Sequence, residues 1–92
     1  MRRYRVVIAP EVADLVRTLH PDLKRSVRNA LDAVADTPSI GDLLRGELEG
    51  LSRYRVRRFR IVYAVDRSTR AVRVVAVGPR LTIYDAVTGG RR

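Results

Sequence analysis

The stretch RYRVRRFRIVY, residues 53–63, decides how the rest of the sequence is interpreted. Arginines alternate with aromatic and aliphatic residues on both sides of the dipeptide Arg57-Arg58, which is the pattern of two β-strands joined by a short turn. With Arg57-Arg58 as a two-residue turn, Arg55 lies opposite Arg60 and Tyr54 lies opposite Ile61. The stretch therefore predicts a β-hairpin with a defined register.

This register separates two kinds of side chain, because successive residues of a strand point to opposite faces. The predicted core face carries Tyr54, Val56, Phe59, Ile61 and Tyr63. The predicted basic face carries Arg53, Arg55 and Arg60, although like charges directly opposite one another destabilise a sheet. Such a face is suited to an anion, and phosphate fits several guanidinium groups. The turn lacks the Gly or Asn that tight hairpins prefer, so a wider loop or a bulge with another register is the alternative.

Outward from this hairpin, hydrophobic periodicity indicates the other elements. Pro10 and Pro21 are expected in the first turns of two helices, and Thr37-Pro38 ends the second helix. The predicted elements are a strand at 4–9, helices at 10–19 and from Pro21 to Thr37, a loop at 39–50, and strands at 52–57, 59–66 and 71–78. The expected fold is α+β: a mostly antiparallel four-stranded sheet with a two-helix hairpin packed on one face.

Length and composition restrict the class of protein. With 92 residues, 46% of them apolar, the chain is expected to be one globular domain over 1–92, with a flexible tail at 88–92. No apolar run approaches the roughly 20 residues of a membrane span. No signal peptide is visible at the start, so we expect a cytoplasmic protein.

The charge and the missing residue types indicate the kind of chemistry. The net charge is +9, and 18 of the 19 cationic residues are arginine, which favours a polyanionic partner bound through phosphate contacts. The absence of cysteine excludes disulfides, thiol nucleophiles and cysteine-based zinc sites. His20 is the only histidine and is expected to cap or flank the second helix. We therefore expect neither a metal nor another cofactor.

Three motifs around the hairpin extend the pattern. They are Leu44-Arg45-Gly46-Glu47-Leu48-Glu49-Gly50 before it, and Val77-Gly78-Pro79-Arg80 and Ile83-Tyr84 after it. With the order strand, two helices, glycine loop and three strands, they make the sequence similar to the RelE/ParE toxin superfamily over nearly its whole length. The resemblance implies the toxin of a type II toxin–antitoxin system. RelE-like members are typically ribosome-dependent endoribonucleases that cut mRNA, whereas other members poison DNA gyrase.

The resemblance also implies the site residues. The positions that match the catalytic set of RelE-like nucleases are Arg53, Arg55, Arg60, Arg80 and Tyr84. The first two positions are often lysine in RelE, and arginine is a poor general base because it keeps its proton. We therefore favour Arg60 and Arg80 over Arg53 and Arg55 as catalytic residues. Substrate binding is predicted for Arg45, Arg57 and Arg58.

In the implied reaction, an RNA 2′-OH attacks the adjacent phosphate and the 5′-oxygen leaves, without a metal ion. Arginines stabilise the charge that develops on the phosphate, and Tyr84 acts as acid or base or stacks on a base. Asp42 is a less favoured candidate for the base. The expected partners are mRNA, the ribosomal decoding site and a cognate antitoxin protein, with no membrane. The alternatives are a non-catalytic, ParE-like inhibitor of DNA gyrase and a nucleic-acid-binding module without activity.

Overall fold

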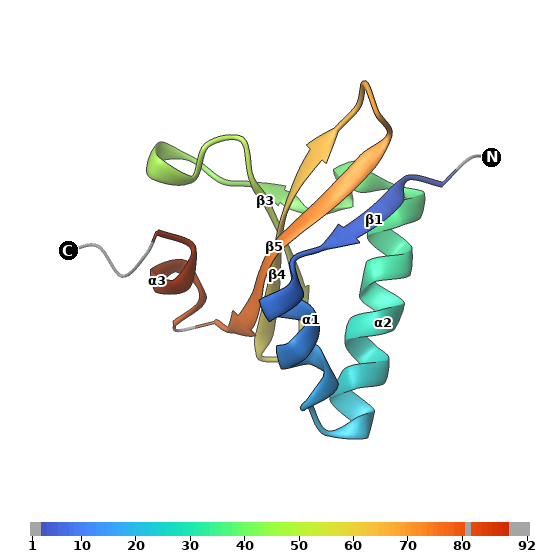
Figure 1. Ribbon diagram of the computed structural model, residues 1–92. Helices are drawn as coiled ribbons and strands as arrows, with labels where there is room; N and C mark the ends of the chain where they lie inside the picture. Colours follow the sequence, from blue (N-terminus) through green and yellow to red (C-terminus); the bar gives the residue numbers. More distant parts are fainter. Residues whose placement is uncertain (1–2, 81, 89–92) are drawn as a thin grey trace.

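A single mixed sheet organises the computed structural model, which describes residues 3–80 and 82–88 (Figure 1). The strand order is β1-β5-β4-β3-β2, in which β1 pairs parallel to β5 and the other neighbours are antiparallel. The strands are β1 (Arg5–Ile8), β2 (Asp42–Leu43), β3 (Ser52–Val56), β4 (Phe59–Asp66) and β5 (Ala71–Pro79). The helices are α1 (Pro10–Arg17), α2 (Pro21–Asp36) and α3 (Ile83–Thr88), with short 3₁₀ turns at Pro38–Ile40 and Gly46–Leu48. The α+β class and the mostly antiparallel sheet are confirmed.

The predicted register of the β3–β4 hairpin is confirmed. Arg55 pairs with Arg60, and Val56 pairs with Phe59 across the two-residue turn. The turn requires a residue in the left-handed backbone conformation. Arg57 adopts it, with φ 56°, although it is not glycine. Packing of the apolar face therefore holds the register where the turn sequence alone does not favour it.

The two N-terminal helices cover one face of the sheet. Pro10 and Pro21 occupy the first turns of α1 and α2, as predicted. The Nδ1 atom of His20 accepts a hydrogen bond from the backbone N–H of Asp22, so His20 is the N-cap of α2. The helices and the sheet share one apolar core, whose most deeply buried members include Val27, Val34, Ile61, Tyr63, Val72 and Val74.

Tyr63 anchors the segment that follows α2. Its buried hydroxyl donates to the carbonyl oxygen of Pro38 at 2.8 Å and accepts from the N–H of Gly41 at 3.1 Å. A Cβ atom at Gly41 would clash with this hydroxyl and with the carbonyl oxygen of Arg53, which is why a glycine is required there. Burial raises the pKa of Tyr63 above its ordinary value, since the interior disfavours a phenolate.

Two elements were not predicted. The sheet has five strands rather than four, because Asp42–Leu43 within the predicted loop pairs with Arg53 and Ser52 of β3. Two residues are too short to show a periodic pattern. The chain also continues into α3, where the sequence analysis placed no element, and Thr88 ends this helix. The rest of the predicted tail, residues 89–92, lies outside the described part of the chain.

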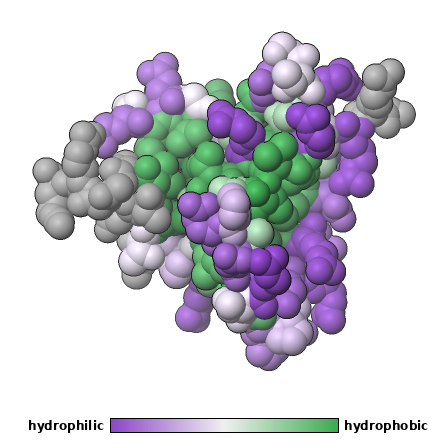
Figure 2. Space-filling view, in the orientation of Figure 1, coloured by the Kyte–Doolittle hydropathy of each residue, from purple (hydrophilic) through white to green (hydrophobic). Residues whose placement is uncertain are grey.

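Helix α3 divides the face that was expected to be basic. Val62 and Ala76 lie on this face and pack with Ile83 of α3 in a second, smaller apolar cluster. Apolar area also remains exposed beside it: Figure 2 shows a hydrophobic surface in the middle of the view, and Val7 and Val75 are 41% and 36% exposed. The open face is therefore partly apolar, and the arginines are confined to separate parts of it.

Candidate functional site: an arginine pocket

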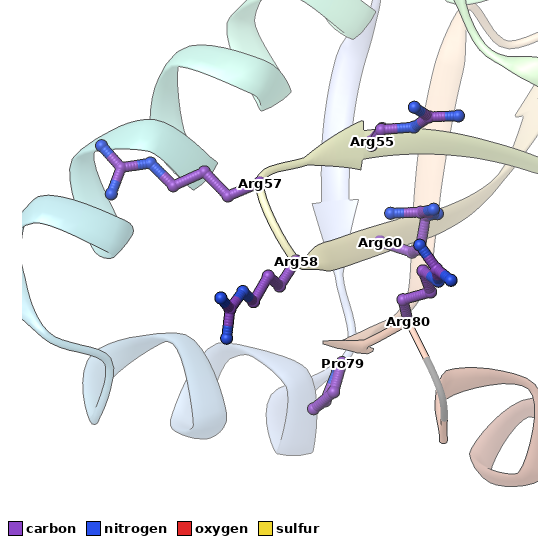
Figure 3. A pocket seen from close by; sticks show the side chains of 6 residues that line it. All are labelled: Arg55, Arg57, Arg58, Arg60, Pro79 and Arg80. Carbon is purple, nitrogen blue, oxygen red and sulfur yellow. The ribbon is translucent and has the colours of Figure 1, made fainter.

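The β3–β4 turn and the end of β5 form a pocket lined almost entirely by arginine. The backbone N–H of Arg80 donates to the carbonyl oxygen of Arg58 at 2.9 Å, which joins the end of β5 to the turn. The resulting cavity has a volume of about 410 Å³ and is lined by Arg55, Arg57, Arg58, Arg60, Pro79 and Arg80 (Figure 3). We call these six residues the arginine pocket.

The side chains of the arginine pocket point in two directions. Figure 3 shows Arg55, Arg60 and Arg80 extending to the same side, with the guanidinium groups of Arg60 and Arg80 close to one another. Arg57 and Arg58 extend away from them toward the helices. Three arginine side chains therefore lie on one side of the sheet, while the two turn arginines extend the positive surface around its end.

Arg60 is the most unusual member because it is buried. Only 6% of the residue is exposed, and its Nη1 donates to the carbonyl oxygen of Phe59 at 3.3 Å. No ion pair among the described residues involves Arg55, Arg60 or Arg80. A buried cation without a carboxylate is unfavourable in the free protein. An incoming phosphate would supply the missing negative charge.

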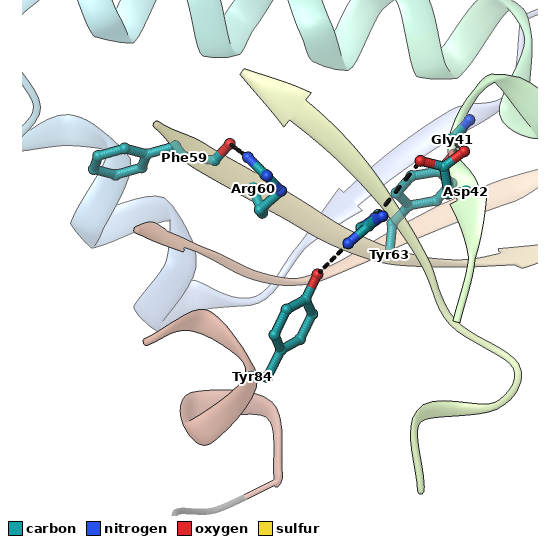
Figure 4. Close-up of polar contacts among 7 residues, drawn as sticks. Gly41, Asp42, Phe59, Arg60, Tyr63 and Tyr84 are labelled. Carbon is teal, nitrogen blue, oxygen red and sulfur yellow. Dashed lines mark hydrogen bonds and ion pairs between the residues drawn. The ribbon is translucent and has the colours of Figure 1, made fainter. Parts of the chain in front are cut away.

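A second constellation links β2, β3 and α3 (Figure 4). Nη1 of Arg53 donates to the hydroxyl of Tyr84 at 3.3 Å, and Nε of Arg53 lies 3.6 Å from Oδ2 of Asp42. The hydrogen bond to Tyr84 and the charge interaction with it, and after them the charge of Asp42, raise the pKa of Arg53 above its ordinary value. Tyr84 also packs on the apolar cluster of Val62 and Ile83, so its position depends on α3.

The structure thus separates the residues that the sequence analysis grouped. Arg55, Arg60 and Arg80 lie together with Arg57 and Arg58 in the arginine pocket. Arg53 and Tyr84 belong to the neighbouring constellation, which also includes Asp42. Arg45 lines a different hollow, beside Asp42 and Arg67. Across the described ranges, no three His, Asp or Glu side chains gather where they could hold a metal ion.

The role of α3 in this site was not predicted from the sequence. The available signal was Val62, an apolar residue at a basic-face position, together with Ile83 and Val87 at the four-residue spacing of a helix. Together they indicate a helix that covers part of the open face. None of the helices within the described residues is long and apolar enough to cross a membrane.

Comparison with known proteins assigns the family. The sequence model of the ParE-like toxin of type II bacterial toxin–antitoxin systems matches residues 6–88, which is most of the chain. The chain belongs to this toxin family. No curated protein sequence matches that of the toxin.

Several solved structures share the fold of the toxin. The RelBE2 toxin–antitoxin complex from Mycobacterium tuberculosis matches with a TM-score of 0.78 and 24% identity, covering 87% of this chain and 94% of that one. A variant of the Escherichia coli toxin RelE in the free state matches with a TM-score of 0.78 and 21% identity, covering 94% and 92%. The YoeB/ParE toxin from Agrobacterium tumefaciens matches with a TM-score of 0.72 and 18% identity, covering 83% and 98%. The RelE-like fold expected from the sequence is confirmed.

Proposed function

We propose that the toxin is a metal-independent endoribonuclease that cleaves mRNA on the ribosome. The observation that carries the proposal is Arg60, a buried arginine that has no ion pair with a carboxylate among the described residues and lies in one pocket with Arg55 and Arg80. A scissile phosphate in this pocket would meet cations that are already in place. Fixed cations stabilise the charge that develops on phosphoryl oxygens in the transition state.

The reaction follows from the chemistry of RNA. The 2′-oxygen forms a bond to the adjacent phosphorus while the bond from phosphorus to the 5′-oxygen breaks, leaving a 2′,3′-cyclic phosphate and a 5′-hydroxyl. In this scheme Arg60 and Arg80 stabilise the phosphate, and Arg53 and Arg55 direct the backbone and polarise the 2′-OH. The 2′-OH loses a proton and the 5′-oxygen gains one. Tyr84 and Asp42, both in contact with Arg53, are the candidates for these transfers.

Binding of the RNA beyond the reacting phosphate is assigned to other arginines. Arg57 and Arg58 are exposed at the hairpin turn and line the arginine pocket. Arg45 is exposed ahead of β3 and lines the hollow next to Asp42. The natural partner that restrains the toxin is a cognate antitoxin protein, since a surface that damages RNA must be masked in the resting cell.

The family match favours one alternative, a ParE-like inhibitor of DNA gyrase without nuclease activity. A cleavage assay separates the two functions. Purified toxin is added to ribosomes with an end-labelled mRNA, and the new ends are analysed. The nuclease predicts fragments that end in a 2′,3′-cyclic phosphate, with little cleavage by Arg60→Ala. Intact mRNA together with inhibited gyrase would establish the alternative.

A further inference from the structure

The turn between β4 and β5 carries a second group of arginines. Arg5, at the start of β1, donates its backbone N–H to the carbonyl oxygen of Arg70 at 2.9 Å. The Tyr4 ring lies 5.2 Å from the guanidinium carbon of Arg70, and the Tyr4 hydroxyl accepts a hydrogen bond of 3.4 Å from Arg67. We call Tyr4, Arg5, Arg67 and Arg70 the turn patch. It lies at the upper end of the sheet in Figure 1, opposite the end that holds the arginine pocket.

The positive charge of the turn patch is not balanced by ion pairs. Arg5, Arg67 and Arg70 are exposed, and no ion pair within the described part of the chain includes them. The turn itself contains the carboxylate of Asp66, whose Oδ1 accepts hydrogen bonds from the N–H and hydroxyl of Ser68 and from the N–H of Thr69. Its oxygen is thus used to shape the turn, and the arginines remain available to an outside anion.

The backbone conformation of Arg70 is a second observation that points to a role of its side chain. Arg70 has φ 54°, in the left-handed region where glycine or asparagine is favoured. Arg57, in the other hairpin turn of the sheet, has φ 56°. Residues held in such conformations are often functional. Both turns of the β3–β4–β5 meander thus present an arginine at a position where the backbone favours another residue.

The positive surface continues from the turn patch toward Arg45, in the loop that precedes β3. Arg67 and Arg45 line a common hollow of about 620 Å³, to which Ser39 and Ser52 also contribute. Asp42 is the carboxylate in this hollow, and it lies beside Arg53. The hollow therefore connects Arg45, a predicted substrate-binding residue, with an arginine that no motif had singled out.

We propose that the turn patch is a second contact for RNA backbone phosphates, separate from the arginine pocket. The inference rests on the proposed function and names a further part of its RNA-binding surface. The eight residues of β4 span roughly 26 Å at the usual rise per residue, so the patch contacts RNA well away from the scissile phosphate. It contributes to affinity for RNA and not to the chemical step.

The test compares two double variants that remove the same charge. Arg67→Gln/Arg70→Asn alters the turn patch, and asparagine tolerates the left-handed backbone, so the turn is retained. Arg25→Gln/Arg28→Gln removes two exposed arginines from α2 as the matched control. The probe is a short 2′-O-methyl oligoribonucleotide, which binds without being cleaved, and its Kd is measured over a range of salt concentrations. Thermal melts verify that both variants are folded.

We expect the turn-patch variant to bind the probe several-fold more weakly at low salt. A plot of the logarithm of the association constant against the logarithm of the salt concentration has a negative slope. For the double variant this slope should become less negative by about 1.4, which is about 0.7 for each of two lost phosphate contacts to a single strand. Arg67→Gln alone should give about half of the change in slope.

Binding equal to the wild type, or a loss no larger than that of the α2 control, would overturn the proposal. The proposal would also be overturned if the variant kept its RNA binding and lost only antitoxin binding, because the turn patch would then be a protein-binding surface. The outcome is independent of nuclease activity, since the probe is not cleaved. Weakened binding with no mRNA cleavage by the wild type would retain the patch and contradict the proposed nuclease.

Discussion

Arg60 and its neighbours determine what the site can do. Its buried guanidinium group lies across the β3–β4 ladder from Arg55 and shares the arginine pocket with Arg80. Mutual repulsion and desolvation both act against folding at this position, because no carboxylate in the described part of the chain forms an ion pair with Arg60. These three arginines are therefore the part of the molecule where the requirements of stability and of anion binding are in conflict.

This conflict predicts a stabilising substitution. Arg60→Gln keeps part of the aliphatic stem but removes the charge, which relieves about 0.2–1 kcal/mol of like-charge repulsion across the strands. A gain of 1 kcal/mol raises the melting temperature of a domain of this size by about 4–8 °C, so we expect an increase of a few degrees or less. The gain should be smaller at high salt, where screening already weakens the repulsion. Thermal melts at two salt concentrations measure it.

The control for this experiment is Arg28→Gln, which removes an exposed charge from α2 and should leave the melting temperature almost unchanged. A clear decrease in melting temperature for Arg60→Gln at both salt concentrations would show that Arg60 stabilises the fold. The anion-binding interpretation of the pocket would then be wrong.

The same residues carry the second prediction. Arg60→Ala or Arg80→Ala should reduce mRNA cleavage by a factor of roughly 10²–10³, as the loss of one fixed electrostatic contact to a transition state does. Circular dichroism should show a folded protein in both cases. Cleavage and growth inhibition are measured in parallel, and a folded variant with full toxicity would refute the role assigned to that arginine.

At the scale of elements, the segment between α2 and β3 is held by Tyr63. Tyr63→Phe removes the acceptor of the Gly41 N–H and the donor to the Pro38 carbonyl. Leaving such buried groups unpaired costs about 1–3 kcal/mol, so the melting temperature should fall by about 4–8 °C for each kcal/mol. Tyr54→Phe is the control, since the Tyr54 hydroxyl forms no hydrogen bond within the described residues. An equal effect of the two variants would contradict the anchoring role of Tyr63.

Tyr63 also predicts a dependence of stability on pH. Burial raises the pKa of Tyr63 in the folded state. As pH rises, Tyr63 therefore ionises in the unfolded chain at a lower pH than in the folded protein. The contribution of Tyr63 is complete below pH 10 and is lost as pH increases toward the folded-state pKa. The difference in stability between the wild type and Tyr63→Phe should therefore narrow above pH 10 in alkaline unfolding experiments. A constant difference across this range would contradict the assignment.

The elements also show how much could be predicted from the sequence. The alternation of Tyr54, Val56, Phe59 and Ile61 determined the hairpin register correctly, because a slip by one residue would expose the whole apolar set. Strand β2 could not be predicted, since two residues carry no periodicity and their pairing depends on β3. Helix α3 was missed because its apolar residues pack on Val62 and Ala76, which lie side by side only when β4 and β5 are paired.

The candidate site was predictable only in part, for a related reason. Arg55 and Arg60 followed from the register, and Arg80 and Tyr84 from the resemblance to the RelE/ParE superfamily. Their separation into a pocket and an Arg53–Tyr84–Asp42 constellation depends on tertiary contacts, which no local pattern contains. The turn patch was not predicted, because Tyr4 and Arg67 lie far apart in the sequence and meet only through the parallel pairing of β1 with β5.

At the scale of the whole molecule, the net charge of +9 governs association. A cognate antitoxin that covers the arginines should carry an acidic or amphipathic segment, and its association should be fast at low salt. We expect the association rate constant to decrease as salt increases, because screening shortens the reach of the charges. Stopped-flow or surface-based kinetics with the co-purified neighbouring gene product measure this. Neutralisation that needs no protein contact would contradict the proposed partner.

The proposed nuclease acts on RNA and leaves DNA topology unchanged. The most direct measurement is to induce the toxin in growing cells and to follow mRNA integrity and plasmid supercoiling in the same samples. We expect rapid loss of full-length mRNA with normal supercoiling, and no such loss when Arg60→Ala is induced. Intact mRNA with altered supercoiling would contradict it and identify a gyrase inhibitor instead.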